Sequence, residues 1–266
     1  MKSGFCVSLK ELKTLIRYLE KFDKKPMDFV DLSGTEICRL TEKETEALAE
    51  CLNKYQIPCM GIHASFPADI KFIGKEKRIT SLEDHTRRLA ERCDILGCKK
   101  IGIGSPGSRF RDADISEKEA DEQMVDTLYR IRQLAQNQMI LLENICPAET
   151  NYINSARHAE ALINRLDDPG IGIICDIYHF FCCREKLDYL TSHFWSKVFY
   201  LHIADPVKRR YLSRNTDNAF IQYTLKVLKK AYRADGISVE ASTENIIEEL
   251  MECRAILQLL ESEMNL

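Results

Sequence analysis

The sequence predicts a single (β/α)8 TIM barrel, and three observations support this fold class. Short apolar runs alternate with longer amphipathic segments along the whole 266-residue chain. The length matches one barrel of this kind, which typically needs about 250 residues. No linker-like change of composition divides the chain, so we expect residues 1–266 to form one domain.

Eight apolar runs have the character of β-strands. An amphipathic segment separates each run from the next, which is the pattern of parallel strands joined by helices. The predicted strands are Gly4–Ser8, Met27–Ser33, Pro58–Ala64, Lys99–Gly104, Met139–Asn144, Gly172–Asp176, Val198–Ala204 and Ile237–Ala241.

Eight further segments are predicted to be helical. In the first of them, Leu12, Leu15, Ile16 and Leu19 recur at the spacing of one helix face. The predicted helices cover residues 9–24, 42–55, 80–97, 116–138, 154–166, 184–194, 218–234 and 243–262.

Several of these helices carry sequence signals for their ends. Thr41 with Glu44, and Ser116 with Glu119, have the spacing of a capping box. Gly97 stands where the third helix should stop, because glycine readily adopts the left-handed conformation that ends many helices.

A doubly wound parallel sheet is the competing fold. It would need a glycine-rich phosphate loop after its first strand, and residues 8–14 contain no glycine. The segment Gly-Ile-Gly-Ser-Pro-Gly at 102–107 follows the fourth strand and has the wrong spacing. The barrel therefore remains the predicted fold.

The composition argues against several classes of protein. The 38 basic and 41 acidic residues give a formal net charge of −3, without a long basic block, so we expect no nucleic-acid partner. No apolar stretch is long enough to span a membrane, and the first ten residues lack the apolar core of a signal peptide. The 11 cysteines include no C-x-x-C pair. We interpret most of them as core residues of a cytoplasmic protein.

Ionisable residues follow four consecutive predicted strands, starting with the fifth. In a barrel the carboxyl ends of the strands carry the chemistry, so the residues at these ends are the candidates for a site. They are Glu143, Asp176, His202 and Glu240, separated by 33, 26 and 38 residues, about one strand and helix each.

A single carboxylate at a strand end usually caps the next helix or pairs with a neighbour. Four such residues on adjacent strands would instead point at a common centre, where three carboxylates repel one another unless a cation neutralises them. Oxygen ligands with one imidazole suit Mn²⁺, Mg²⁺ or Co²⁺, and Zn²⁺ also fits. The sequence therefore predicts a site for one divalent metal ion.

At these strand ends the sequence resembles the xylose isomerase-like TIM barrels, specifically their sugar phosphate isomerase/epimerase group. The similarity extends over essentially the whole chain and is carried by Leu-Leu-Glu-Asn, Cys-Asp-Ile-Tyr-His, Leu-His-Ile-Ala-Asp and Val-Glu-Ala. In ketose 3-epimerases of this group the four equivalent residues bind one divalent metal. The resemblance thus assigns metal binding to Glu143, Asp176, His202 and Glu240, with Mn²⁺ as the expected ion.

The same resemblance implies catalytic and substrate-binding roles. Glu143 and Glu240 would be the acid–base pair, and His179, three residues after Asp176, would contact the substrate. Asn144, beside Glu143, is a further substrate-binding candidate. We interpret His63, which follows the third strand, as part of the pocket wall. Barrels of this group often dimerise or tetramerise, so a homo-oligomer is also expected.

The expected reaction is proton transfer next to the carbonyl of a small sugar-like substrate. A metal bound to a carbonyl and an adjacent hydroxyl stabilises the enediolate, while one glutamate removes the proton and the other returns it. This describes an isomerase or epimerase. If the same enolate expelled a β-hydroxyl, the enzyme would be a dehydratase of a keto-polyol or keto-acid, which we keep as the alternative.

The loop after the seventh strand departs from the epimerase pattern. Members of the group commonly have an arginine there, followed by a glycine-rich loop, whereas this chain has no glycine between His202 and Gly236. Either Lys208 or Arg209 can take the arginine role and bind a phosphate or carboxylate of the substrate. The alternative is a solvated basic loop. The missing glycines put the usual free-sugar substrates in doubt.

Two rival functions come from other classes of protein. An endonuclease IV-like repair enzyme shares the fold, and His63, Asp176 and His179 give it partial support. However, the fourth strand ends without a histidine, and no Asp-x-His pair follows the seventh. A non-catalytic metal-binding subunit is the other rival, and the two glutamates argue against it.

Overall fold

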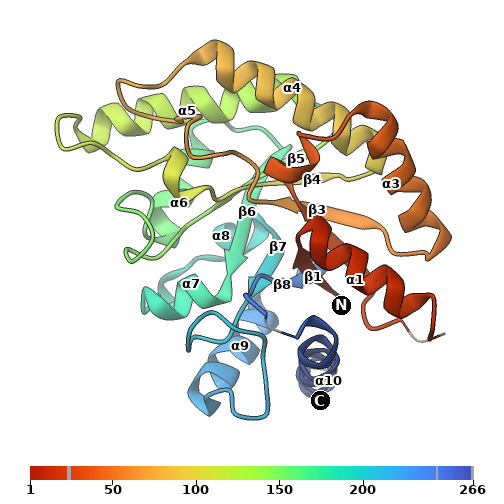
Figure 1. Ribbon diagram of the computed structural model, residues 1–266. Coiled ribbons are helices and arrows are strands. Elements are labelled where there is room, and N and C mark those ends of the chain that lie inside the picture. The colour runs from red at the N-terminus through yellow and green to blue at the C-terminus, as the bar shows by residue number, and fades with distance from the viewer. Residues whose placement is uncertain (23–24, 244, 265–266) are drawn as a thin grey trace.

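The computed structural model describes residues 1–22, 25–243 and 245–264, which form a closed barrel of eight parallel strands in the order β1 to β8. Figure 1 shows helices arranged around the outside of these strands. The predicted (β/α)8 fold is therefore confirmed. The strands are β1 Lys2–Val7, β2 Phe29–Ser33, β3 Cys59–His63, β4 Lys100–Ile103, β5 Met139–Glu143, β6 Ile171–Asp176, β7 Val198–Ile203 and β8 Gly236–Val239.

The helices connect successive strands and cover the outer surface of the barrel (Figure 1). Two single 3₁₀ turns, Pro106–Ser108 and Leu187–Tyr189, lie in the connecting loops. The helices are α1 Leu9–Leu19, α2 Gly34–Ile37, α3 Glu42–Lys54, α4 Ile79–Leu96, α5 Glu117–Leu134, α6 Ala156–Asn164, α7 Ile177–Cys182, α8 Ser192–Ser196, α9 Asn218–Lys230 and α10 Ile246–Met264.

The predicted helix caps are present. Thr41 and Ser116 each accept a hydrogen bond from the backbone N–H three residues on, and the glutamate at that position bonds back. Ser8 forms a third box of the same kind at the start of α1. Gly97 ends α4 with φ of 70°, the left-handed conformation expected of it.

The predicted helix over residues 184–194 is wrong. The chain forms α7 directly at the end of β6, because Asp176 caps that helix by accepting the backbone N–H of Tyr178 at 2.8 Å. After α7 ends, Arg184 adopts a left-handed φ of 54°, and α8 starts only after Thr191. The sequence reasoning assigned Asp176 to the site and overlooked that it also starts a helix.

The remaining helices agree with the prediction except at their ends. The helices predicted over 9–24, 116–138 and 218–234 stop several residues earlier than expected. Residues 23–24, 244 and 265–266, some of which fall within predicted segments, lie outside the described residues.

The inside of the barrel is built in layers. Phe29, Leu141, Ile174 and Tyr200, from β2, β5, β6 and β7, form a small apolar cluster that is separate from the main core between strands and helices. Successive side chains of a strand point to opposite faces, so the residue two positions further on also points inward. Those four residues are Asp31, Glu143, Asp176 and His202. A polar layer therefore lies directly above an apolar one.

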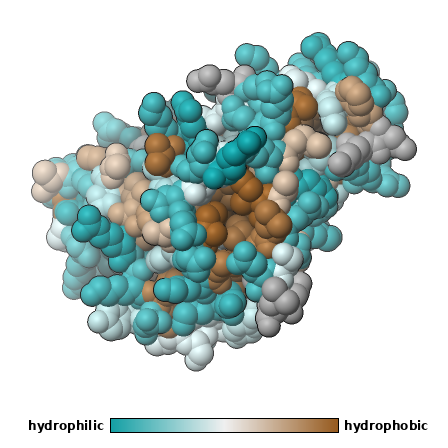
Figure 2. Space-filling view, turned by 90° about the horizontal axis from the view of Figure 1, so that it is seen from below, coloured by the Kyte–Doolittle hydropathy of each residue, from teal (hydrophilic) through white to brown (hydrophobic). Residues whose placement is uncertain are grey.

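The face of the molecule seen from below is mostly hydrophilic (Figure 2). Figure 2 shows the molecule from below, with a hydrophobic area at the centre of a largely hydrophilic face. Among the described residues no helix combines the length and the apolar composition needed to cross a membrane. Eight of the cysteines are buried and all 11 are free thiols, as expected for core residues.

Candidate metal centre

The fold brings the four predicted metal ligands together. One ligand atom each from Glu143, Asp176, His202 and Glu240 forms a group in which all atoms lie within 4.8 Å of one another. His202 is central, because its Nδ1 lies 3.3 Å from Glu143 Oε1 and 3.4 Å from Glu240 Oε2. The carboxyl ends of β5, β6 and β7, together with the residue after β8, thus supply one cluster.

The donor set fits a divalent metal ion. Glu143 Oε1, Asp176 Oδ2 and His202 Nδ1 are buried and have no hydrogen-bond partner among the described residues. Buried polar atoms are normally satisfied, so three such atoms facing one another favour a ligand-binding role. Carboxylate oxygens with one imidazole nitrogen suit Mn²⁺, Mg²⁺ or Co²⁺, and also accommodate Zn²⁺.

Arg209 supplies positive charge to this cluster. Its Nη2 lies 2.7 Å from Glu240 Oε2 and 3.6 Å from Asp176 Oδ2. Burial opposes ionisation of Glu240, but Arg209 and His202 outweigh it and hold the pKa of Glu240 well below its usual range. Burial likewise favours neutral His202, yet the carboxylates of Glu143 and Glu240 raise the pKa of the imidazole well above its usual value. The cluster therefore attracts cations.

A cavity of about 240 Å³ opens onto the cluster. Its ligand side consists of Glu143, His202 and Glu240 from the second half of the barrel. The opposite side comes from His63, the last residue of β3, and from the loops after β3 and β4. The loop residues are apolar or small and comprise Ala64, Phe66, Ala68, Gly104, Ser105, Pro106 and Gly107.

His179 lies in the cavity wall and is oriented to donate a hydrogen bond. Its Nδ1 accepts the backbone N–H of Cys146 at 3.2 Å, so in the neutral ring the proton resides on Nε2. Burial lowers the pKa of His179, which keeps the ring neutral. Nε2 is buried, lacks a hydrogen-bond partner among the described residues and lies 3.5 Å from Asp176 Oδ2. A substrate oxygen in the cavity is a suitable acceptor.

Two of the other substrate-binding candidates line the cavity and two do not. His63 and Arg209 line the cavity, and His63 Nδ1 lies 3.6 Å from Glu240 Oε1. Asn144 is fully buried and Lys208 is exposed, and the described cavity wall includes neither. Of the two basic residues that the sequence left as alternatives, Arg209 faces the cluster and Lys208 does not.

The backbone of this loop adopts, without glycine, conformations that glycine usually provides. Lys208 and Arg209 both have left-handed backbone conformations, with φ of 64° and 47°. Such conformations usually favour glycine and cost an ordinary residue free energy. The loop is anchored by backbone hydrogen bonds from Asp205 to Arg210 and from Ser242 to Arg209. This anchoring holds Arg209 over the site.

Two residues that the sequence reasoning missed belong to the site. Glu149 lines the cavity and its Oε1 lies 2.7 Å from Arg209 Nη1. Glu149 lies in a loop, where no periodic pattern of the sequence predicts which way a side chain points. Asp31 is buried in β2, close to His202, and burial raises the pKa of its carboxyl group. An acidic residue within an otherwise apolar strand is unusual, and this feature of the sequence could have identified Asp31 as a candidate.

The structure is a (β/α)8 barrel with an oxygen-rich candidate cation site at the carboxyl ends of its strands. The chain belongs to the xylose isomerase-like TIM barrel family, whose model matches residues 16–255. The family resemblance inferred from the strand-end motifs is therefore confirmed. A comparison with curated proteins gives no match.

Several solved structures have the same fold. The 3-keto-D-glucoside 4-epimerase YcjR from E. coli superimposes with a TM-score of 0.78 and 18% identity, covering 98% of this chain and 99% of that one. D-psicose 3-epimerase from Clostridium cellulolyticum H10, solved with D-tagatose, gives 0.78 and 16%, with 99% of both chains covered. The IolI protein, solved with a zinc atom, gives 0.69 and 17%, covering 99% and 98%. The TM-scores establish a shared fold.

Proposed function

We propose that this chain is a divalent-metal-dependent isomerase or epimerase that acts on a small sugar-like substrate. The observation that carries the proposal is the group of four ligand atoms at the carboxyl ends of neighbouring strands, of which Glu143, His202 and Glu240 line a cavity. Membership of the family supports it, as does the presence of epimerases among the structures with this fold. Mn²⁺ is the expected ion, held by Glu143, Asp176, His202 and Glu240.

Glu143 and Glu240 are the candidates for proton transfer. They approach His202 Nδ1 from two different strands, at 3.3 and 3.4 Å, and both line the cavity. A divalent ion bound here would stabilise the negative charge that develops on a carbonyl oxygen when the neighbouring carbon loses a proton. One glutamate, as a carboxylate, removes this proton, and the other, as a carboxylic acid, delivers a proton of its own to the opposite face, which inverts the carbon centre. His179 holds a substrate oxygen by hydrogen bonding.

The charges around the cavity favour an uncharged sugar over a sugar phosphate. Arg209 is the one lysine or arginine in the described cavity wall, and two carboxylates already engage it, Glu149 at Nη1 and Glu240 at Nη2. A phosphate group needs donors that are free to bind it bidentately. Lys208, which the sequence left as a phosphate-binding candidate, is exposed outside this wall.

The test is hydrogen exchange with solvent. The Mn²⁺-loaded protein is incubated in D₂O with a panel of ketoses, ketose phosphates and keto-acids, and deuterium at the carbon beside the carbonyl is followed by NMR. We expect exchange with an uncharged ketose. Glu143→Gln and Glu240→Gln should each lower its rate about 100-fold or more, since general acid–base catalysis contributes at least that much.

A surface glutamate provides the matched control. Glu46 is exposed on α3, so Glu46→Gln should exchange as fast as the wild type. Absence of bound metal in the wild type after Mn²⁺ is supplied would reject the proposed function. Exchange followed by loss of water from the substrate would identify the dehydratase instead, and a preference for ketose phosphates would reject the uncharged substrate.

A further inference from the structure

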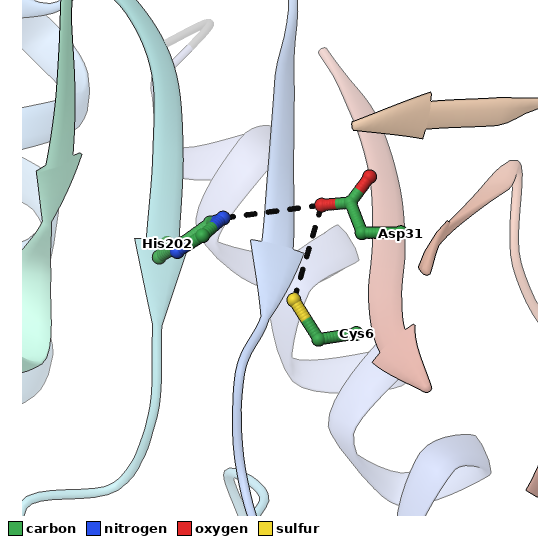
Figure 3. Close-up of side chains that lie close together, drawn as sticks. All are labelled: Cys6, Asp31 and His202. Carbon is green, nitrogen blue, oxygen red and sulfur yellow. Dashed lines mark hydrogen bonds and ion pairs between the residues drawn. The ribbon is translucent and has the colours of Figure 1, made fainter. Parts of the chain in front are cut away.

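The nitrogen of His202 that points away from the metal cluster faces a second buried group. Nε2 lies 3.9 Å from Oδ2 of Asp31, and the thiol of Cys6 lies 3.9 Å from the same oxygen. Figure 3 shows the imidazole on β7 and the carboxylate on β2 directed at one another inside the barrel, with Cys6 beside them. All three residues are at least 95% buried.

Asp31 is held firmly in this position. The hydroxyl of Tyr200, one layer below His202, lies 2.8 Å from both carboxylate oxygens of Asp31. On the neighbouring strand Gly61 pairs with Asp31, and a Cβ there would stand only 2.9 Å from Oδ1. The hydroxyl fixes the carboxylate from one side, and the absent side chain leaves it room on the other.

We propose that Asp31 is a positioning residue for the metal site, which sets the tautomer and the orientation of His202. Oδ2 of Asp31 already accepts from the Tyr200 hydroxyl and the Cys6 thiol, and an acceptor near Nε2 favours the proton on that nitrogen, which leaves the lone pair of Nδ1 free for a metal ion. At 3.9 Å the effect is electrostatic, because the separation exceeds that of a hydrogen bond. The inference rests on the proposed function, since it concerns the same metal.

A second metal ion between Cys6, Asp31 and His202 is the alternative for this cluster. An ion about 2.0–2.2 Å from both Nε2 and Oδ2 would need an N–metal–O angle of roughly 125–155°, because these atoms are 3.9 Å apart. That angle is wider than in regular tetrahedral coordination. His202 would also have to lose both ring protons to bind two ions. The geometry therefore favours the positioning role.

The test measures metal affinity and not activity. Mn²⁺ is titrated into chelator-treated protein by calorimetry for the wild type, Asp31→Asn and the control Asp28→Asn. Asp28 precedes β2 and binds Ser3 and Arg254, far from the cluster in the polar layer. Asp31→Asn should raise the dissociation constant about 10–100-fold, as loss of an outer partner of a metal-binding histidine typically does. Asp28→Asn should leave it unchanged.

A second readout distinguishes positioning from a purely structural role. In the metal-free protein, with histidine labelled with ¹⁵N and at a pH at which the His202 ring is neutral, NMR should show the proton on Nε2 in the wild type, and mixed protonation in Asp31→Asn. Tyr200→Phe removes the hydroxyl that holds Asp31 and should weaken Mn²⁺ binding by a smaller factor. This variant carries the test if Asp31→Asn does not fold.

The remaining outcomes distinguish the positioning role from a structural role and from a second metal site. Equal Mn²⁺ affinity of Asp31→Asn and the wild type, with a lower unfolding temperature, would make Asp31 structural and leave the proposed function intact. Two ions bound per chain would overturn the positioning role in favour of a second metal site. A wild type that binds no Mn²⁺ would reject the proposed function and this inference together.

Discussion

At the scale of single residues, the candidate site depends on glycines that leave space as much as on charged side chains. Gly104, just beyond β4, lies so close to Glu143 that a Cβ at this position would overlap the carboxylate oxygen Oε2. The absence of a side chain there gives Glu143 the space to reach His202. Gly61 serves Asp31 in the same way.

Gly104→Ala should therefore impair the site without unfolding the barrel. The added methyl group displaces the Glu143 carboxylate, and a displacement of about 1 Å at a catalytic group can lower the rate about 100-fold. The measurement is solvent deuterium exchange into the ketose, together with the Mn²⁺ dissociation constant.

Gly97→Ala is the matched control for this change. Gly97 ends α4 with φ of 70°, and a Cβ added there would meet no atom of the described residues within 4 Å. The substitution should lower the free energy of unfolding by about 1 kcal/mol and leave exchange unchanged. Full exchange by Gly104→Ala would show that Glu143 does not need this space.

At the scale of elements, the loop after β7 holds Arg209 at the site through a strained backbone conformation. Two consecutive residues, Lys208 and Arg209, have left-handed conformations, and only Arg209 makes contacts at the site. Strain of this kind persists where the surroundings fix the backbone, and it concentrates at functional sites. Lys208 is exposed, so its side chain can be changed without altering the cavity.

Lys208→Gly should stabilise the protein slightly. Relief of a left-handed conformation gains about 1–2 kcal/mol, and the extra freedom of glycine in the unfolded chain costs about 0.5–1 kcal/mol. We expect a net gain of about 0.5–1 kcal/mol in urea unfolding. In contrast, Lys226→Gly, at an exposed position within α9, should lose about 1 kcal/mol. A loss for both variants would mean that the strain at Lys208 is relieved in solution.

The elements also show which parts of the fold and of the candidate site could be predicted from the sequence. Strand ends were predictable because the period of two and the order of the strands direct Glu143, Asp176 and His202 inward. The loops carry no such period, which is why Glu149 was missed and Lys208 could not be separated from Arg209. The helix predicted over 184–194 failed because Asp176 both caps α7 and belongs to the site.

At the scale of the whole molecule, the cluster links metal binding to folding. Its ligands come from four strands whose spacing along the chain exceeds 25 residues at every step, so they meet only when the barrel is closed. An ion bound by all four therefore stabilises the folded state over the unfolded one.

Mn²⁺ should raise the unfolding temperature of the wild type. At a free concentration about 100 times the dissociation constant, the added stability is about 2.7 kcal/mol, or roughly 5–10 °C for a chain of this length. His202→Ala removes the central ligand and should abolish the shift. Differential scanning calorimetry with and without a chelator measures it, and an equal shift in both proteins would locate the ion elsewhere.

The cavity is divided between two parts of the chain. The side that bears the candidate ligands comes from β5 to β8, whereas the facing side comes from the loops after β3 and β4. During evolution the two sides are therefore free to change separately. Descendants of one ancestral barrel can acquire new substrates by altering residues 64–68 and 104–107, while inheriting the reactive centre unaltered. Grafting these two short loops between relatives is the corresponding route to a redesigned specificity.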